Sequence, residues 1–313
     1  MPFANLKDGT TRLFYQTHGS GKDHCIVFVH GGAGGIGSAI LNRMDNAPYT
    51  AEHTKVMTEL SGPGRMCVEF CNRCSGRSSC NLDKPFGVET LATDCIELVH
   101  SLGFGKATVI ASSFGGPTAL WLAENRPSFV QNLVMVHAGG NITHYGFSDK
   151  RVDVIRQFVS QPLAAQKATF ATRGVPEQAR KDVISLFPTP LVPQLLAVPG
   201  LVDRIRASID EMGFSDDDFC QWYRGQMYLM NANIVSDQML DLGRITCPVL
   251  IVHGDKDEAV PYEASVAIQK GTPGAILHAL PGAAHGLANM TDELTPVIRN
   301  WLDEREQQSM SRL

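Results

Sequence analysis

The feature of this sequence that most restricts its fold is an alternation of short apolar segments with helical patterns. The apolar, β-rich segments occupy residues 25–30, 66–71, 107–111, 133–137, 249–253 and 275–280. Between most of them, apolar residues recur at helical spacing, as in residues 88–102 and 294–302. Thr295 and Pro296 are expected to begin the last helix. Short strands alternating with helices predict an α/β fold, with a mostly parallel central sheet flanked by helices.

One long segment interrupts this alternation. Residues 141–246 show several helical patterns and no convincing strand. An all-helical insertion between two strands of one sheet predicts a cap over the edge of the sheet where the strands end. We therefore expect residues 1–140 to form the first part of an α/β core, residues 141–246 a helical cap, and residues 247–313 the second part of the core.

Charge and hydropathy exclude two classes of partner. The formal net charge is −5 and there is no basic block, which argues against a nucleic-acid surface. No apolar stretch approaches the roughly 20 residues of a membrane-spanning helix. The first residues do not resemble a secretory signal, so a cytoplasmic location is expected, and a homo-oligomer stays open. The peroxisomal alternative rests on Ser311-Arg312-Leu313, which differs from the S-K-L signal only by arginine for lysine.

The eight cysteines predict neither a disulfide framework nor a metal site. In a reducing compartment, free thiols packed at strand ends are the expected state. Cys71 and Cys74 have the spacing of a zinc-chelating pair, but a structural zinc usually needs a second such pair, which is missing. We therefore expect no metal and no cofactor.

The sequence around Ser113 carries the first chemical motif. An apolar strand, residues 107–111, leads through two serines and two glycines into a helical pattern. A nucleophile elbow needs small residues two positions before and after the nucleophile, because the strand and the helix pass very close there. Ser113 has Ala111 and Gly115 at those positions, whereas Ser112 has Ile110 and Phe114. The pattern therefore selects Ser113.

Three further segments supply candidate partners for this serine. A buried strand leads into a glycine-rich turn that begins at His30, and such a turn can point backbone N–H groups at a developing oxyanion. Another strand ends at Asp255 and Asp257, and a later one is followed by His285. His137 and His253 lie in or at the ends of strands, where we expect ordinary core or loop histidines. The chain order serine, acid, histidine is that of the α/β-hydrolases.

With these motifs in this order, the sequence resembles the α/β-hydrolase superfamily over nearly the whole chain outside the cap. The resemblance implies the α/β-hydrolase fold with the cap after strand 6, and a triad of Ser113, Asp257 and His285. It also implies an oxyanion hole formed by the N–H groups of Gly32 and Phe114, and a need for no cofactor. The loop at residues 138–141 has no carboxylate that could replace Asp257. A fifth family motif is altered, with cysteines at positions 71 and 74.

The leading function is hydrolysis of a carboxylic ester or lactone of a hydrophobic small molecule. C–C bond hydrolases, prolyl-type aminopeptidases and perhydrolases of the same fold stay open, as does a non-catalytic ligand receptor. Dehalogenases and epoxide hydrolases are disfavoured because they use aspartate as the nucleophile. The acids at residues 216–218 are expected to form a solvated loop or a helix start, although they could instead attract an amino group. The expected substrate-binding residues are Gly31, Trp222, Tyr223, Met227 and Tyr228.

Overall fold

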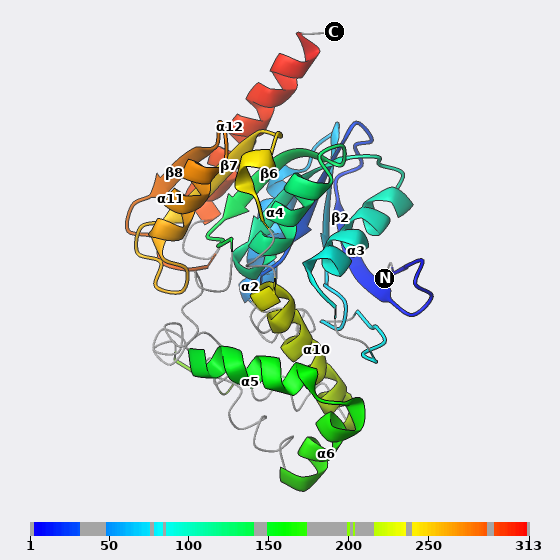
Figure 1. The fold of residues 1–313 in the computed structure, drawn as a ribbon. Coiled ribbons are helices and arrows are strands. Elements are labelled where there is room, and N and C mark those ends of the chain that lie inside the picture. The colour runs from blue at the N-terminus through cyan, green and yellow to red at the C-terminus, as the bar shows by residue number, and fades with distance from the viewer. Residues whose placement is uncertain are drawn as a thin grey trace.

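The computed structural model describes residues 3–31, 48–75, 78–83, 86–140, 149–173, 199–200, 203, 216–235, 240–286 and 291–311. Its centre is an eight-stranded sheet with the strand order β1-β2-β4-β3-β5-β6-β7-β8 (Figure 1). The strands are β1 (Phe3–Asn5), β2 (Arg12–His18), β3 (His24–Val29), β4 (Arg65–Phe70), β5 (Ala107–Ser112), β6 (Val130–Val136), β7 (Val249–Gly254) and β8 (Ile276–Leu280). This is the α/β-hydrolase arrangement that the sequence predicts.

The first two strands were not predicted from the sequence. β1 pairs with β2, and β2 with β4, in antiparallel fashion, whereas the six later strands pair in parallel. β1 has only three residues, and β2 is partly exposed and rich in polar residues. Neither strand has the continuous apolar run by which the six parallel strands can be recognised.

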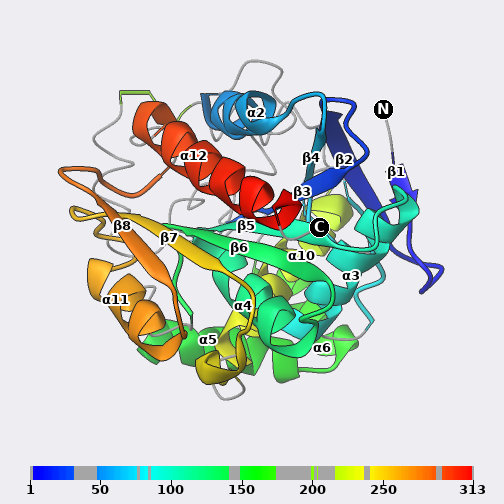
Figure 2. The ribbon, with the colours of Figure 1, turned by 90° about the horizontal axis from the view of Figure 1, so that it is seen from above.

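Helices cover both faces of the sheet (Figure 2). They are α2 (Pro48–Leu60), α3 (Val88–Ser101), α4 (Gly116–Asn125), α11 (Tyr262–Gly271) and α12 (Thr291–Met310), with short 3₁₀ turns η1 (Ser113–Gly115) and η5 (Leu242–Arg244). Successive residues of β3 point to opposite faces. Val27 packs in the cluster that holds residues of α3, α4 and α11, whereas Phe28 packs in the cluster with residues of α2 and α12.

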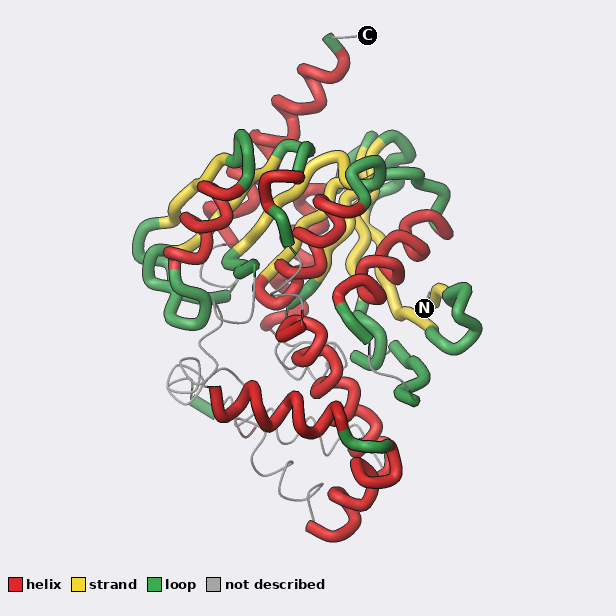
Figure 3. The backbone as a smooth tube through the Cα atoms, in the orientation of Figure 1, coloured by secondary structure: helices red, strands yellow, loops and turns green. Residues whose placement is uncertain are grey.

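Among the described residues, three α-helices lie between β6 and β7 in the chain, and we call them the inserted helices: α5 (Asp149–Ser160), α6 (Leu163–Arg173) and α10 (Asp216–Val235). They extend away from the sheet, on the side opposite the projecting end of α12 (Figure 1). Between β6 and β7 the described residues form helices and no strand (Figure 3). All three inserted helices fall within residues 141–246, the segment for which the sequence predicts only helices.

The prediction that Thr295 and Pro296 begin the last helix is wrong. α12 begins at Thr291 and carries Pro296 inside it. Asp292 and Glu293 occupy its first turn, where acidic side chains favour the positive end of the helix dipole. In the described part of the chain, no helix combines the length and the apolar character needed to cross a membrane. Arg312 and Leu313 of the terminal tripeptide lie outside the described residues.

Candidate active site

Ser113 lies in a sharp turn between β5 and α4. Its φ angle is 47°, in the left-handed region that residues other than glycine enter only at a cost in free energy. A Cβ atom at Gly115 would overlap the carbonyl oxygen of Val29. A Cβ atom at Gly31 would lie 2.6 Å from both the Ser112 carbonyl oxygen and the Ser113 Cβ. Glycine is therefore required at both positions, because the end of β3 packs directly against this turn.

Asp257 and His285 are in direct contact, although 28 residues separate them in the sequence. Oδ2 of Asp257 lies 2.7 Å from Nδ1 of His285. Oδ1 of Asp257 accepts hydrogen bonds from the backbone N–H groups of Ala259, at 2.9 Å, and Val260, at 2.8 Å. The loop after β7 therefore fixes the carboxylate so that one oxygen faces the backbone and the other faces the imidazole.

Burial alone would raise the pKa of Asp257, but hydrogen bonds from His253 and His285 and the charges of His285 and His137 hold that pKa well below its usual value. The carboxylate is therefore ionised at neutral pH. An ionised carboxylate at Nδ1 keeps the proton of a neutral imidazole on that nitrogen and leaves Nε2 free to accept one.

His253 is a second support for Asp257 that the sequence did not reveal. Its Nε2 lies 3.2 Å from Oδ2 of Asp257 and 2.8 Å from the carbonyl oxygen of Val260. Both partners are acceptors, so Nε2 carries the proton and Nδ1 accepts a hydrogen bond from the Ser265 hydroxyl at 2.6 Å. His253 is fully buried. It is a hydrogen-bonded core histidine, as expected, but it also orients the carboxylate that contacts His285.

His137 also lies at the site. It follows β6 directly, and its ring lies against the ring of His285 with 4.5 Å between the centroids. Its Nε2 is 2.7 Å from the hydroxyl oxygen of Ser112, the residue before Ser113. The sequence predicts an ordinary strand-end histidine here, whereas the structure brings it between the elbow and the predicted triad histidine.

His30 holds the beginning of the glycine-rich turn. Its Nε2 accepts a hydrogen bond from the backbone N–H of Asn72 at 2.9 Å, and its Nδ1 donates to the carbonyl oxygen of Gly31 at 2.6 Å. Burial lowers the pKa of His30, although the bond to Gly31 and the charge of Glu69 raise it. A neutral His30 therefore joins the turn to the loop after β4. Gly32 lies outside the described residues.

The predicted substrate-binding residues of α10 differ in their burial and in the residues that they contact. Tyr228 is buried, its ring lies edge-on to Phe86, and its hydroxyl lies 3.1 Å from Nε2 of Gln166. Met227 is buried in the same apolar cluster as Phe114. Tyr223 is partly exposed, and its ring packs edge-on to Phe158 of α5. The side chain of Trp222 is outside the description.

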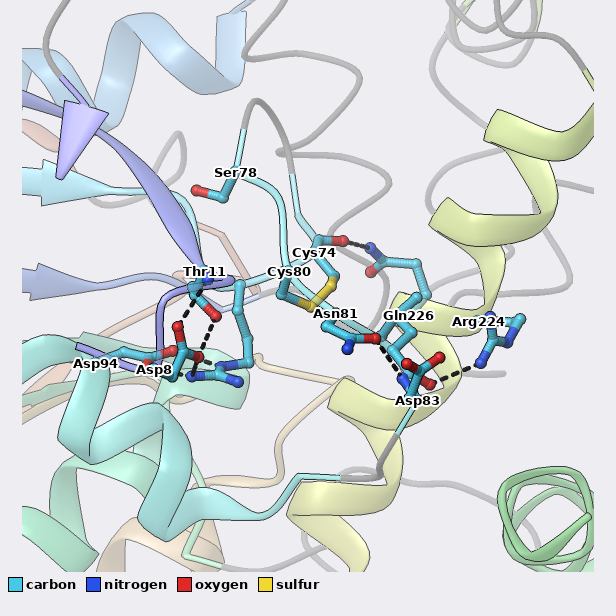
Figure 4. Close-up of a disulfide and its surroundings, with 12 residues drawn as sticks. Asp8, Thr11, Cys74, Ser78, Cys80, Asn81, Asp83, Asp94, Arg224 and Gln226 are labelled. Carbon is cyan, nitrogen blue, oxygen red and sulfur yellow. Dashed lines mark hydrogen bonds and ion pairs between the residues drawn. A yellow bond between two sulfur atoms is a disulfide. The ribbon is translucent and has the colours of Figure 1, made fainter. Parts of the chain in front are cut away.

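The expectation of free thiols is wrong for Cys74 and Cys80, which form a disulfide (Figure 4). Their Cα atoms lie 5.4 Å apart, within the range that a disulfide requires. Cys74 is bonded to Cys80, so Cys71 and Cys74 do not form a chelating pair. Within the described residues, no group of three or more His, Cys, Asp and Glu side chains could hold a metal ion.

The disulfide lies where the loop after β4 meets α10 (Figure 4). Nε2 of Gln226 donates to the carbonyl oxygen of Cys74 at 3.4 Å, and Nη2 of Arg224 donates to the carbonyl oxygen of Leu82 at 2.7 Å. A Cβ atom at Gly225 would lie 2.7 Å from the Cys74 Cβ. The loop therefore packs tightly on α10, and the disulfide restricts the conformations of this contact.

Reduction of the disulfide is expected to lower the unfolding temperature by roughly 5 °C, because a short closed loop stabilises by about 2 kcal/mol. The measurement is a thermal melt with and without dithiothreitol. The variant with Cys74→Ser and Cys80→Ser is the control, and its melt should not respond to the reductant. Eight free thiols in the denatured, untreated protein would contradict the disulfide.

Comparisons with known proteins agree with the geometry. The family model of the alpha/beta hydrolase fold matches residues 25–288. The putative carbamate hydrolase RutD of Caulobacter sp. (strain K31) is 25% identical over 287 residues, which cover 90% of this chain and 92% of that protein. The 2-hydroxy-6-oxononadienedioate/2-hydroxy-6-oxononatrienedioate hydrolase 1 of Dechloromonas aromatica (strain RCB) is 26% identical over 288 residues, which cover 90% of this chain and 88% of that protein.

Solved structures share the fold. The enol-lactonase of Burkholderia xenovorans LB400 superposes with a TM-score of 0.63 at 18% identity, over 96% of this chain and 100% of that one. The names of the relatives agree on hydrolysis and differ in the substrate, so they support hydrolase activity without selecting a bond. Since the family model covers most of the sequence and the observed strand order is that of the fold, this chain belongs to the α/β-hydrolase fold family.

Proposed function

We propose that this chain is a serine hydrolase that cleaves a carboxylic ester or lactone of a hydrophobic small molecule through an acyl-enzyme. The observation that carries the proposal is the contact of Asp257 with His285, which lies beside the Ser113 elbow. The ring of His285 lies against that of His137, and His137 is hydrogen-bonded to the Ser112 hydroxyl. This series of contacts supports a position of His285 within reach of the Ser113 hydroxyl.

In the proposed mechanism, Nε2 of His285 takes the proton of the Ser113 hydroxyl as its oxygen attacks the acyl carbon. Asp257 holds the imidazole by Nδ1 and stabilises the imidazolium that forms. The backbone N–H groups of Gly32 and Phe114 stabilise the oxyanion. His285 then protonates the leaving alcohol, and water attacks the acyl-enzyme by the reverse proton transfers.

The apolar surroundings of the elbow favour a hydrophobic acyl or alkyl group. Phe114, the residue after the proposed nucleophile, and Val260, in the acid loop, share one buried cluster with Met227 and Met230 of α10 and Ile155 of α5. The inserted helices therefore supply apolar side chains next to both catalytic loops. We propose that residues 141–246 act as a cap whose inner surface selects the substrate, because ligand pockets are mostly apolar with few polar groups.

An ester is favoured over an aminoacyl amide by the position of the acids at residues 216–218. α10 begins at Asp216, so these three residues form the first turn of a helix. Acidic residues are common there because they favour the positive end of the helix dipole. Their presence is therefore accounted for without a role in binding an amino group.

Substrate preference is tested with nitrophenyl esters of increasing acyl length beside an aminoacyl nitroanilide. We expect kcat/KM to rise about three- to fourfold per methylene until the pocket is full, because each buried methylene contributes about 0.8 kcal/mol. A fluorophosphonate probe should label Ser113. Faster turnover of the anilide, or a flat response to chain length, would contradict the ester proposal. Absence of both labelling and turnover would favour the ligand receptor.

A further inference from the structure

The rings of two neighbouring histidines, His137 and His285, are in contact at the site, and only His285 has a role in the proposed mechanism. Their ring centroids are 4.5 Å apart and their planes are tilted by 58°. His137 is 2% exposed, and its Nε2 lies 2.7 Å from the hydroxyl oxygen of Ser112. The serine beside the proposed nucleophile therefore contacts the histidine beside the proposed base.

The backbone fixes the point from which the His137 ring emerges. β5 and β6 pair so that Ser112 lies opposite Val136, the residue before His137. The backbone N–H of His137 donates to the carbonyl oxygen of Val252 on β7 at 2.9 Å. The φ angle of His137 is 38°, a left-handed conformation that is strained for a residue with a side chain. The sheet holds the His137 backbone in this strained conformation, and burial and the contact with Ser112 restrict its ring.

Asp257 determines only part of the orientation of His285. The hydrogen bond at Nδ1 fixes one atom of the imidazole, but it permits the ring to turn about the line from Nδ1 to Oδ2. That turn would move Nε2, the atom that must accept the proton of Ser113. A second ring packed on His285 opposes the turn, and His137 is that ring.

We propose that His137 is a positioning residue for His285, and that Ser112 holds His137 in the orientation this requires. The inference rests on the proposed function, in which His285 is the general base. His137 interacts with two ionisable groups of the site, His285 through the ring contact and Asp257 through its charge. Neither Ser112 nor His137 is assigned a contact with the substrate.

Three variants separate the ring contact from the hydrogen bond. His137→Ala removes both and should lower kcat about 100-fold with little change in KM, as expected for a misplaced catalytic group. His137→Phe keeps a ring against His285 and should recover activity to within about 10-fold of the unmodified protein. Ser112→Ala removes only the hydrogen bond and should also cost about 10-fold, with no further loss when combined with His137→Ala.

The matched control is His24 on β3, whose hydroxyl partner lies at the other end of β5 from Ser112. His24 is also buried, and its Nε2 lies 2.7 Å from the hydroxyl of Thr108, which is on β5 like Ser112. His24→Ala therefore removes a similar side chain and a similar hydrogen bond far from the elbow, together with the contact of Nδ1 with Glu306 at 2.6 Å. We expect it to lower the unfolding temperature and to leave kcat within about twofold of the unmodified protein. If either alanine variant fails to fold, His24→Phe and His137→Phe are compared instead.

The rate of Ser113 labelling by the fluorophosphonate probe gives a readout independent of substrate, and it should fall in proportion to kcat in the His137 variants. Unchanged kcat and labelling in His137→Ala, with only a lower unfolding temperature, would overturn the inference while the proposed function stands. The inference would also be overturned if Ser112→Ala lowered kcat by the same factor in the unmodified protein and in His137→Ala. Failure of the unmodified protein to react with the probe or any ester would overturn the proposed function, and this inference with it.

Discussion

Ser113→Ala is expected to lower kcat by about 10⁴- to 10⁶-fold, the largest effect of any single substitution considered for this chain. The elbow gives Ser113 the strained φ of 47° and places it at the start of η1, which leads into α4. An alanine keeps this backbone and removes only the hydroxyl, so the folded structure should persist. The measurement is the kcat for the best ester of the acyl series, together with the unfolding temperature.

The control for this prediction is the neighbouring serine. Ser112→Ala should lower kcat only about 10-fold, because Ser112 contacts His137 and is assigned no role in substrate binding. The fluorophosphonate probe should still label Ser112→Ala and should not label Ser113→Ala. If Ser112→Ala abolishes activity while Ser113→Ala retains it, the assignment of the nucleophile is contradicted.

The candidate triad could be predicted because each of its members sits in a local sequence pattern. Ser113 is marked by small residues two positions away on either side, and Asp257 and His285 each follow an apolar strand. The carboxyl ends of parallel strands meet at one edge of a sheet, so residues that follow such strands converge there. The 2.7 Å contact of Asp257 with His285 agrees with this expectation.

The supporting contacts could not be predicted because they depend on which strands are neighbours. His137 follows β6, which lies between β5 and β7, and no local sequence pattern predicts this strand order. His253 is four residues before Asp257, but its ring is identified as a support only by the loop that turns Val260 back towards it. A histidine at the end of a strand next to the nucleophile's strand is the one signal that points to His137.

The disulfide was missed for a different reason. The prediction of free thiols rests on the expected redox compartment, which concerns the average protein and not a particular loop. Cys74 has a φ angle of 57°, and this left-handed turn brings the chain back so that the Cα atoms of Cys74 and Cys80 lie 5.4 Å apart. Local backbone geometry therefore decides the pairing. Elsewhere, burial raises the pKa of Cys25 and Cys67 to about 12, so these thiols stay protonated and unreactive.

Asp257→Asn is expected to lower kcat by about 10⁴-fold, the effect of forcing a catalytic histidine into the wrong tautomer. The N–H groups of Ala259 and Val260 both point at Oδ1, so the amide oxygen of asparagine must take that position. The amide NH₂ then faces Nδ1 of His285, where it can only donate. His285 responds by placing its proton on Nε2, which can no longer accept the proton of Ser113.

The same substitution should change the dependence of stability on pH. Because the pKa of Asp257 is lower in the folded chain than the value near 3.9 expected when unfolded, the unfolded state binds more protons as the pH falls. The stabilisation by this carboxylate is therefore complete above about pH 4 and is lost at lower pH as the folded-state pKa is approached. Urea unfolding below about pH 4 should show a steeper loss of stability in the unmodified protein than in Asp257→Asn.

Asp255→Asn is the matched control for Asp257→Asn, because it makes the same chemical change two residues away in the same loop. Asp255 is exposed, and its Oδ1 accepts a hydrogen bond from the backbone N–H of Gly282 at 2.7 Å, which an asparagine oxygen can also accept. We expect its kcat to stay within about threefold of the unmodified protein, since an exposed polar contact contributes little. A collapse of activity in Asp255→Asn with retention in Asp257→Asn would move the acid of the triad to Asp255. Equal losses in both variants would mean that the loop, and not the Asp257 carboxylate, limits the reaction.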